Sequence, residues 1–131
     1  MSYVVWFKDL NKNSIPTAGG KGSNLGEMFN LGIPVPNGFA ITAQTYKSFI
    51  ERTNIKDKIQ SFLIGLDVED TEKLQKISLD IQKLVSSTPL PADITEEIME
   101  NYELLGADKR NAQEIIQGKD AFVAVRSSAT A

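Results

Sequence analysis

The stretch TAGGKGSNLGEM, residues 17–28, places three glycines and one lysine directly before a helical pattern that begins at Leu25. Glycines let backbone N–H groups approach an anion, a helix N-terminus adds partial positive charge, and a lysine adds a full charge. The same glycines suit a flexible turn that leads into a helix. The stretch taken alone leaves both interpretations open, and other parts of the chain must decide between them.

Two well-defined phosphate-binding motifs do not match this stretch. A P-loop requires Gly, four residues and then Gly-Lys-Ser/Thr, but Ile15 stands at the first glycine position and Gly22 follows Lys21. A dinucleotide-binding fingerprint fails as well, because Leu25 occupies its third glycine position. A phosphate loop here would therefore be of another kind.

Composition narrows the class of protein. The 131 residues suit one domain, and 41% hydrophobic with 24% charged residues is typical of a soluble globular protein. A net charge of -3 gives no basic field for nucleic acid or an anionic membrane. The chain has no cysteine and no histidine, so it builds neither a disulfide nor a Ser-His-Asp triad by itself. With no signal peptide and no apolar membrane span, we expect a cytoplasmic protein.

The expected fold class is α/β, with short strands from both ends of the chain and a helical middle. YVVWF (3–7) and GFAI (38–41) are short β-branched or aromatic runs and predict strands. AFVAV (121–125) is a continuous apolar run and predicts a strand buried on both faces. Because the chain stops just after that strand, we expect it to be part of a longer reading frame.

The polar residues 11–24 predict a loop. A helix of about two turns should follow from Leu25, with Ser23 or Asn24 as its cap and with Gly32 at its end. The apolar residues of this helix that share one face are Leu25, Met28 and Phe29.

Three longer helices are predicted in the middle of the chain. Thr42 is a natural N-cap for residues 43–53, and the apolar periodicity predicts further helices over 70–87 and 91–106. The helix of 91–106 should end at Gly106, with its acids forming a solvated surface. The aromatic residues expected in the core rather than in an adenine pocket are Tyr46, Phe49 and Tyr102.

Arg126 provides a second candidate anion-binding element. It follows the predicted last strand and precedes Ser-Ser-Ala-Thr, as a bidentate phosphate or carboxylate clamp with hydroxyl donors beside it would. An isolated arginine at a strand end can equally reach solvent or pair with an acid. Two anion-binding elements at opposite ends of one small domain favour a ligand site.

Three motifs in this order resemble a known family. GGKGSNLGEM, GIPVPNGFAIT and VAVRSSATA are similar to the N-terminal part of the phosphoenolpyruvate synthase family, with pyruvate phosphate dikinase and rifampicin phosphotransferase as relatives. The resemblance covers residues 4–131 and is weakest over 51–118. It implies that residues 1–131 are the N-terminal portion of a truncated ATP-grasp nucleotide-binding domain.

The resemblance also implies an activity and partners. Such enzymes use ATP and Mg²⁺ to phosphorylate a histidine on a separate domain, which passes the phosphoryl group to pyruvate, while ATP and water become AMP and phosphate. The expected partners are ATP and the phosphohistidine and pyruvate-binding domains of the same full-length chain. With these domains absent from residues 1–131, the piece alone is expected to be inactive.

By this resemblance the ATP phosphates contact Lys21 and Arg126, which are the candidate catalytic residues. The wider set of candidate nucleotide-binding residues is Gly19, Gly20, Lys21, Gly22, Arg126, Ser127 and Thr130. No acid in the chain is assigned to metal, and Mg²⁺ ligands are expected beyond Ala131. The alternatives are a related nucleotide domain with another acceptor, and a stand-alone docking module with an exposed apolar stripe on 70–86 or 91–106.

Overall fold

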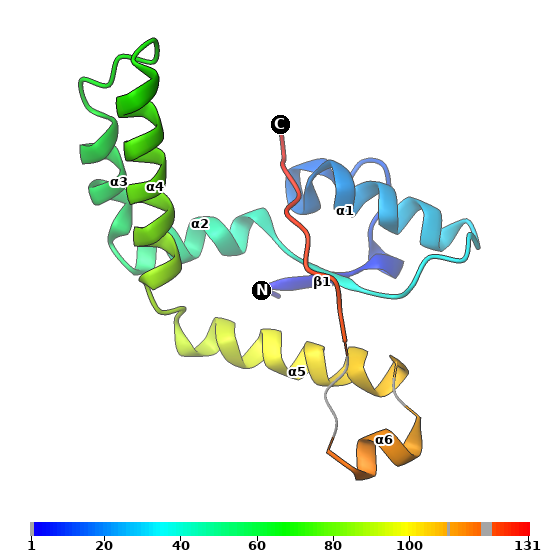
Figure 1. Ribbon diagram of the computed structural model, residues 1–131. Coiled ribbons are helices and arrows are strands. Elements are labelled where there is room, and N and C mark those ends of the chain that lie inside the picture. The colour runs from blue at the N-terminus through cyan, green and yellow to red at the C-terminus, as the bar shows by residue number, and fades with distance from the viewer. Residues whose placement is uncertain (1, 110, 119–121) are drawn as a thin grey trace. The chain divides into compact units, whose positions relative to one another are not determined.

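A computed structural model describes residues 2–109, 111–118 and 122–131, and it confirms the α/β class (Figure 1). The chain folds into two compact units, Met1–Tyr46 with Asp93–Ala131, and Lys47–Ala92. The elements in chain order are β1 (Val4–Trp6), η1 (Phe7–Asp9), α1 (Ile15–Asn30), β2 (Phe39–Ile41), α2 (Ala43–Arg52), α3 (Ile55–Leu63), α4 (Thr71–Ser87), α5 (Ala92–Lys109) and α6 (Ala112–Ile116).

The strands predicted at 3–7 and 38–41 are confirmed as β1 and β2. They pair antiparallel, with Val4 opposite Ile41 and Trp6 opposite Phe39. The Trp6 and Phe39 rings lie 5.3 Å apart between centroids, a cross-strand aromatic pair. A two-stranded sheet is only marginally stable alone, so β1 and β2 depend on the helices around them.

The core of the first unit lies between η1 and α1. Phe7, Leu10 and Ala18 are buried there, and the edge of the Phe7 ring meets Phe29 of α1 at 6.3 Å between centroids. The partly buried residues that pack against this cluster are Val5, Leu25, Phe29 and Ala40. The predicted apolar face of α1 is thereby confirmed for Leu25 and Phe29.

Side chains of α5 hold β1 in place. The Glu97 carboxylate accepts the backbone N–H groups of Tyr3 and Val4, the latter at 2.9 Å. Asn101 Oδ1 accepts the Trp6 indole N–H at 2.8 Å, and Ile94 beside them is fully buried. The prediction that the acids of α5 form only a solvated surface is wrong for Glu97, because its carboxylate satisfies amide groups of a neighbouring strand.

The loop predicted over 11–24 is wrong beyond Ser14, because α1 already begins at Ile15. Pro16 lies in the first turn, where its missing N–H and fixed φ favour a helix. The helix is interrupted at Gly19, with φ 72° and ψ 177°, and then continues to Asn30. Ser23 is not a cap but lies inside the helix, 1% exposed, and its hydroxyl has no hydrogen-bond partner among the described residues.

Three other predicted helices are confirmed as α2, α4 and α5. Thr42 caps α2, since its hydroxyl accepts the Thr45 N–H at 3.1 Å. Asp70 caps α4 in the same way through the Lys73 N–H, at 3.2 Å. The predicted end of α5 at Gly106 is wrong, because the helix continues to Lys109.

The aromatic residues predicted for the core are not all there. Phe49 is buried, as expected, and Tyr102 is partly buried. Tyr46, however, is 55% exposed. It precedes Phe49 by three positions in α2 but does not share its burial, so the prediction that Tyr46 lies in the core is wrong.

The strand predicted over 121–125 is also wrong. Residue 121 lies outside the described residues, and no strand forms over 122–131. Phe122 is 98% and Val125 is 92% exposed. A strand needs a partner for its backbone ladder, whereas in this segment the Ala129 carbonyl oxygen accepts the Gly20 N–H of α1. Both strands of the described sheet therefore come from the first third of the chain.

Gly26 in α1 gives a test of the first core. In an exposed helix, Gly→Ala stabilises by about 1 kcal/mol. At Gly26 an added Cβ would lie 2.4 Å from Leu10 Cβ and 2.8 Å from the Leu10 carbonyl oxygen. We therefore expect Gly26→Ala to lower the free energy of unfolding by about 2 kcal/mol, measured by denaturant titration.

Gly20→Ala is the matched control, because an added Cβ there meets no atom within 4 Å. It should keep or raise the free energy of unfolding. A Gly26→Ala variant as stable as this control would contradict the close packing of α1 on Leu10.

Candidate functional site

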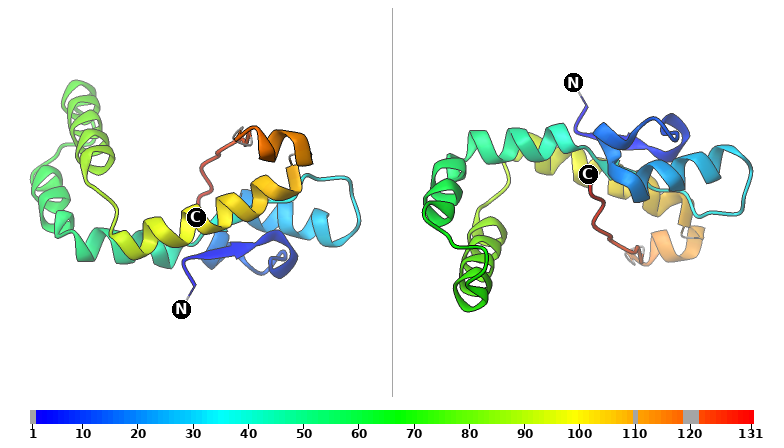
Figure 2. Two further views of the ribbon diagram at one scale, coloured as in Figure 1. Left: turned by 90° about the horizontal axis from the view of Figure 1, so that it is seen from below. Right: turned by 90° about the horizontal axis from the view of Figure 1, so that it is seen from above.

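The two candidate anion-binding elements meet in the structure. The Gly20 N–H donates to the Ala129 carbonyl oxygen at 2.9 Å, and the Gly22 N–H donates to Ser128 Oγ at 3.1 Å. The Ser128 hydroxyl in turn donates to the Ala18 carbonyl oxygen at 2.7 Å. The C-terminal segment lies beside the first half of α1 in Figure 1 and again in the right view of Figure 2.

Gly19 makes this contact possible. Its φ of 72° with ψ of 177° is a backbone conformation open essentially to glycine. A Cβ there would lie 2.4 Å from Ser128 Oγ and 2.8 Å from the Ala129 carbonyl oxygen. Because Gly19 has no side chain, it can adopt the conformation that interrupts α1 and also leaves room for the C-terminal segment.

The cations of the site are exposed. Lys21 lies between the two glycines whose N–H groups hold the C-terminal segment, and Arg126 lies two residues before Ser128. Within the described part of the chain, neither side chain forms an ion pair or a hydrogen bond. The helical segment that restarts after Gly19 adds the partial positive charge of a helix start. The two segments that meet here thus each carry one exposed cationic side chain, which has no partner among the described residues.

The hydroxyl groups of the C-terminal segment have different roles. Ser127 and Thr130, the predicted polar contacts, are exposed and form no hydrogen bond with the residues described. Ser128, which sequence reasoning did not select, forms both hydroxyl hydrogen bonds to α1. No sequence signal separates Ser128 from Ser127, because only the fold shows which hydroxyl faces α1.

The acids that the structure describes do not form a metal site. In the described ranges no group of three or more His, Cys, Asp or Glu side chains is arranged to hold a metal ion. Glu27 of α1 is partly buried, and its carboxylate accepts the Lys12 N–H at 3.0 Å. As to membranes, the helices described are each too short or too polar to cross one.

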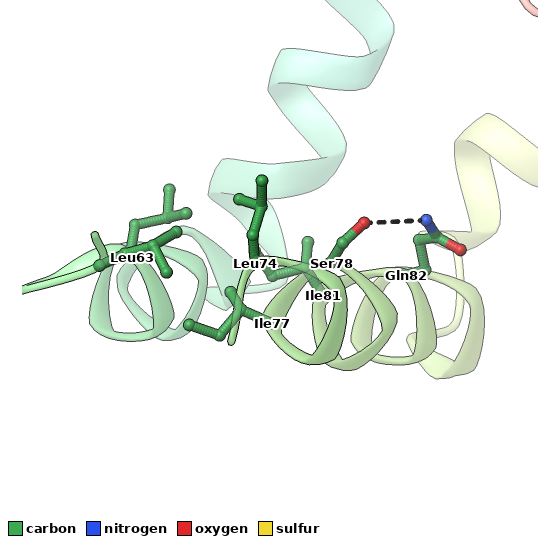
Figure 3. Close-up of a pocket in the computed structure, with 7 residues that line it drawn as sticks. Leu63, Leu74, Ile77, Ser78, Ile81 and Gln82 are labelled. Carbon is green, nitrogen blue, oxygen red and sulfur yellow. Dashed lines mark hydrogen bonds between the residues drawn. The ribbon is translucent and has the colours of Figure 1, made fainter. Parts of the chain in front are cut away.

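The second unit carries an apolar hollow of about 220 Å³ between α3 and α4 (Figure 3). Its lining residues are Leu63, Leu66, Leu74, Ile77, Ser78, Ile81 and Gln82. The polar groups there bond to each other, since Gln82 Nε2 donates to Ser78 Oγ at 3.2 Å. No residue of α4 is fully buried, but of its apolar residues only Leu74 and Leu79 are exposed, and Ile77 and Ile81 are partly buried. With no charged lining residue, the hollow does not suit a nucleotide phosphate.

Comparison with known proteins defines the class. Residues 15–131 match the family described as pyruvate phosphate dikinase, AMP/ATP-binding domain, and the chain belongs to this family. This match includes both candidate elements and the helices of the second unit.

The chain is also similar to curated proteins that are named as phosphoenolpyruvate synthases. The chain is 45% identical to a probable phosphoenolpyruvate synthase of Methanothermobacter thermautotrophicus, over 100% of this chain and 18% of the relative. It is 48% identical to a probable phosphoenolpyruvate synthase of Archaeoglobus fulgidus, over 98% of this chain and 16% of the relative. It is 36% identical to the phosphoenolpyruvate synthase of Pyrococcus furiosus, over 98% of this chain and 19% of the relative. The chain thus spans less than a fifth of the length of these relatives.

Gly19→Ala tests the contact between the C-terminal segment and α1. The added Cβ would overlap Ser128 and Ala129, and the positive φ disfavours alanine. We expect residues 122–131 to detach from α1. The Gly20 N–H would then lose its acceptor, the Ala129 carbonyl oxygen, and its amide exchange rate should rise by about tenfold or more. Hydrogen exchange followed by mass spectrometry measures this change. Gly20→Ala is the control, because it also replaces a glycine of α1. An unchanged exchange rate in the Gly19→Ala variant would contradict the contact.

Proposed function

We propose that this chain is the N-terminal, ATP-binding part of a cytoplasmic phosphoenolpyruvate synthase with an ATP-grasp nucleotide domain. In this proposal, residues 18–22 and 126–130 together form its site for the ATP phosphates. The observation that carries the proposal is the hydrogen-bonded contact of Ser128 and Ala129 with Gly20 and Gly22 of α1, which joins the segments of Lys21 and Arg126 in a member of an ATP-binding family.

The proposed reaction uses ATP and water to convert pyruvate to phosphoenolpyruvate, with AMP and phosphate as the other products. A histidine carries the phosphoryl group between the two half-reactions. This chain has no histidine, so the carrier and the pyruvate site belong to other domains of the full-length protein. The much greater length of the relatives supports this division of labour.

The side chains of the site suit their proposed tasks. Phosphoryl transfer depends mainly on positioning and on neutralising the charge of the phosphate oxygens. Lys21 supplies a compact point charge, and Arg126 supplies a planar fork that binds phosphate oxygens bidentately. Ser127, which follows Arg126 directly in the chain, and Thr130 add exposed hydroxyl groups to the same segment.

Mg²⁺ does not fit the residues present. The described part of the chain holds no suitable acidic cluster, so we assign no step of the reaction to a metal bound by these residues. In the proposed full-length enzyme, Mg²⁺ ligands come from beyond residue 131. The contribution of this chain to phosphate binding is then cationic side chains and hydrogen-bond donors.

This proposal accounts for more observations than the two alternatives. A stand-alone docking module explains the apolar hollow of α3 and α4, but the match to the nucleotide-binding family includes these helices. A dikinase or phosphotransferase with another acceptor would share the nucleotide site. The synthase is preferred because the names of the compared relatives, at 36% to 48% identity, are those of synthases.

Lys21→Ala and Arg126→Ala in the full-length protein test the site. Each should lower pyruvate-dependent formation of AMP from ATP by roughly 100-fold or more, because each removes a charge that stabilises the transferring phosphates. Both side chains are exposed, so circular dichroism and thermal unfolding should match those of the wild type.

Lys76→Ala is the matched control. It removes an exposed lysine from α4, and it should leave the rate unchanged. Near-normal AMP formation by either the Lys21 or the Arg126 variant would refute the proposed site.

A further inference from the structure

We propose that Ser128 is a positioning residue for the phosphate site. Its hydroxyl caps the segment of α1 that restarts after Gly19 and fixes the backbone that carries Lys21 against the segment that carries Arg126. This inference rests on the proposed function, since it names a residue that shapes the same site.

The Ser128 hydroxyl uses both of its hydrogen-bonding roles on α1. As acceptor it takes the Gly22 N–H at 3.1 Å, and as donor it reaches the Ala18 carbonyl oxygen at 2.7 Å. These two groups lie on opposite sides of the break at Gly19. One side chain therefore bridges the end of the first helical segment and the start of the second.

This contact has the geometry of a helix cap supplied from a distant part of the chain. The first N–H groups of a helix lack carbonyl partners one turn earlier, and a serine hydroxyl near the helix start commonly accepts one of them. The residue at the break is Gly19, which has no side chain to do so. Ser128, 106 positions after Gly22, takes this role, and Ala129 accepts the Gly20 N–H beside it.

The cap constrains the two candidate cations together. The residues on both sides of Lys21 donate their N–H groups to Ser128 and Ala129, so the backbone of Lys21 is held at two points. Arg126 is joined to Ser128 by two peptide bonds, through Ser127. After loss of the hydroxyl, the hydrogen bond from the Gly20 N–H to the Ala129 carbonyl oxygen would still connect the two segments.

The experiment compares Ser128→Ala with Ser128→Thr, which keeps a hydroxyl, in the full-length protein. Ser86→Ala is the matched control, because it removes an exposed serine hydroxyl from α4. The first measurement is amide exchange at Gly22 without nucleotide, which should rise in Ser128→Ala and stay near the wild-type rate in the other two variants. This readout reports the cap itself and does not depend on ATP binding.

The second measurement is the dissociation constant for ATP, obtained by calorimetry. We expect Ser128→Ala to weaken binding by about tenfold, with Ser128→Thr closer to the wild type. Combined with Lys21→Ala, the Ser128→Ala change should weaken binding by less than about twofold more, because a residue that acts through another gives non-additive effects. A purely structural serine would not produce this dependence on Lys21.

Three outcomes would overturn the inference. Unchanged exchange at Gly22 in Ser128→Ala would show that the hydroxyl does not cap the helix. The positioning role would also be refuted if exchange at Gly22 rose while the ATP affinity stayed at the wild-type value. It would likewise be refuted if the fold-changes in the ATP dissociation constant caused by Ser128→Ala and Lys21→Ala multiplied in the double variant. A wild-type protein that fails to bind ATP would instead refute the proposed function, and the positioning role would fall with it.

Discussion

The candidate site depends on the absence of a side chain at Gly19. The C-terminal segment approaches the backbone there so closely that a single Cβ would lie 2.4 Å from Ser128 Oγ. The same residue breaks α1 with a positive φ and turns the following N–H groups toward Ser128 and Ala129. The glycine stretch therefore binds another part of the chain, the segment that contains Ser128 and Ala129. Lys21, between Gly20 and Gly22, is exposed there.

The rest of the first unit supports this junction through contacts between distant parts of the sequence. The small sheet is held by η1 and α1 on the Phe7 and Leu10 side, and by the Glu97 and Asn101 side chains of α5 at β1. Close approach recurs at Gly26, where α1 packs on Leu10. Each of these contacts joins local elements that are individually too small to be stable.

Local signals in the sequence predicted most elements. Apolar periodicity and caps located α2, α4 and α5, and β-branched or aromatic runs located β1 and β2. Several predictions were wrong.

The glycines within 11–24 suggested a loop. A local signal, Pro16 in the first helical turn, and a tertiary contact, the packing of Ala18 in the core, favour a helix with one break instead. The apolar run of 121–125 suggested a strand, but none of its described residues is paired in the sheet. The motifs indicated Lys21 and Arg126, whereas the choice of Ser128 over Ser127 depends on which hydroxyl faces α1.

The most direct test of the central claim is a crystal structure of the full-length protein with a non-hydrolysable ATP analogue. The account predicts phosphate oxygens within about 3 Å of both the Lys21 ammonium group and the Arg126 guanidinium group, a normal charged hydrogen-bond distance. Ser128 Oγ should still accept the Gly22 N–H in that complex. Phosphates bound elsewhere, with Lys21 and Arg126 in solvent, would contradict the claim that the two elements form one phosphate site.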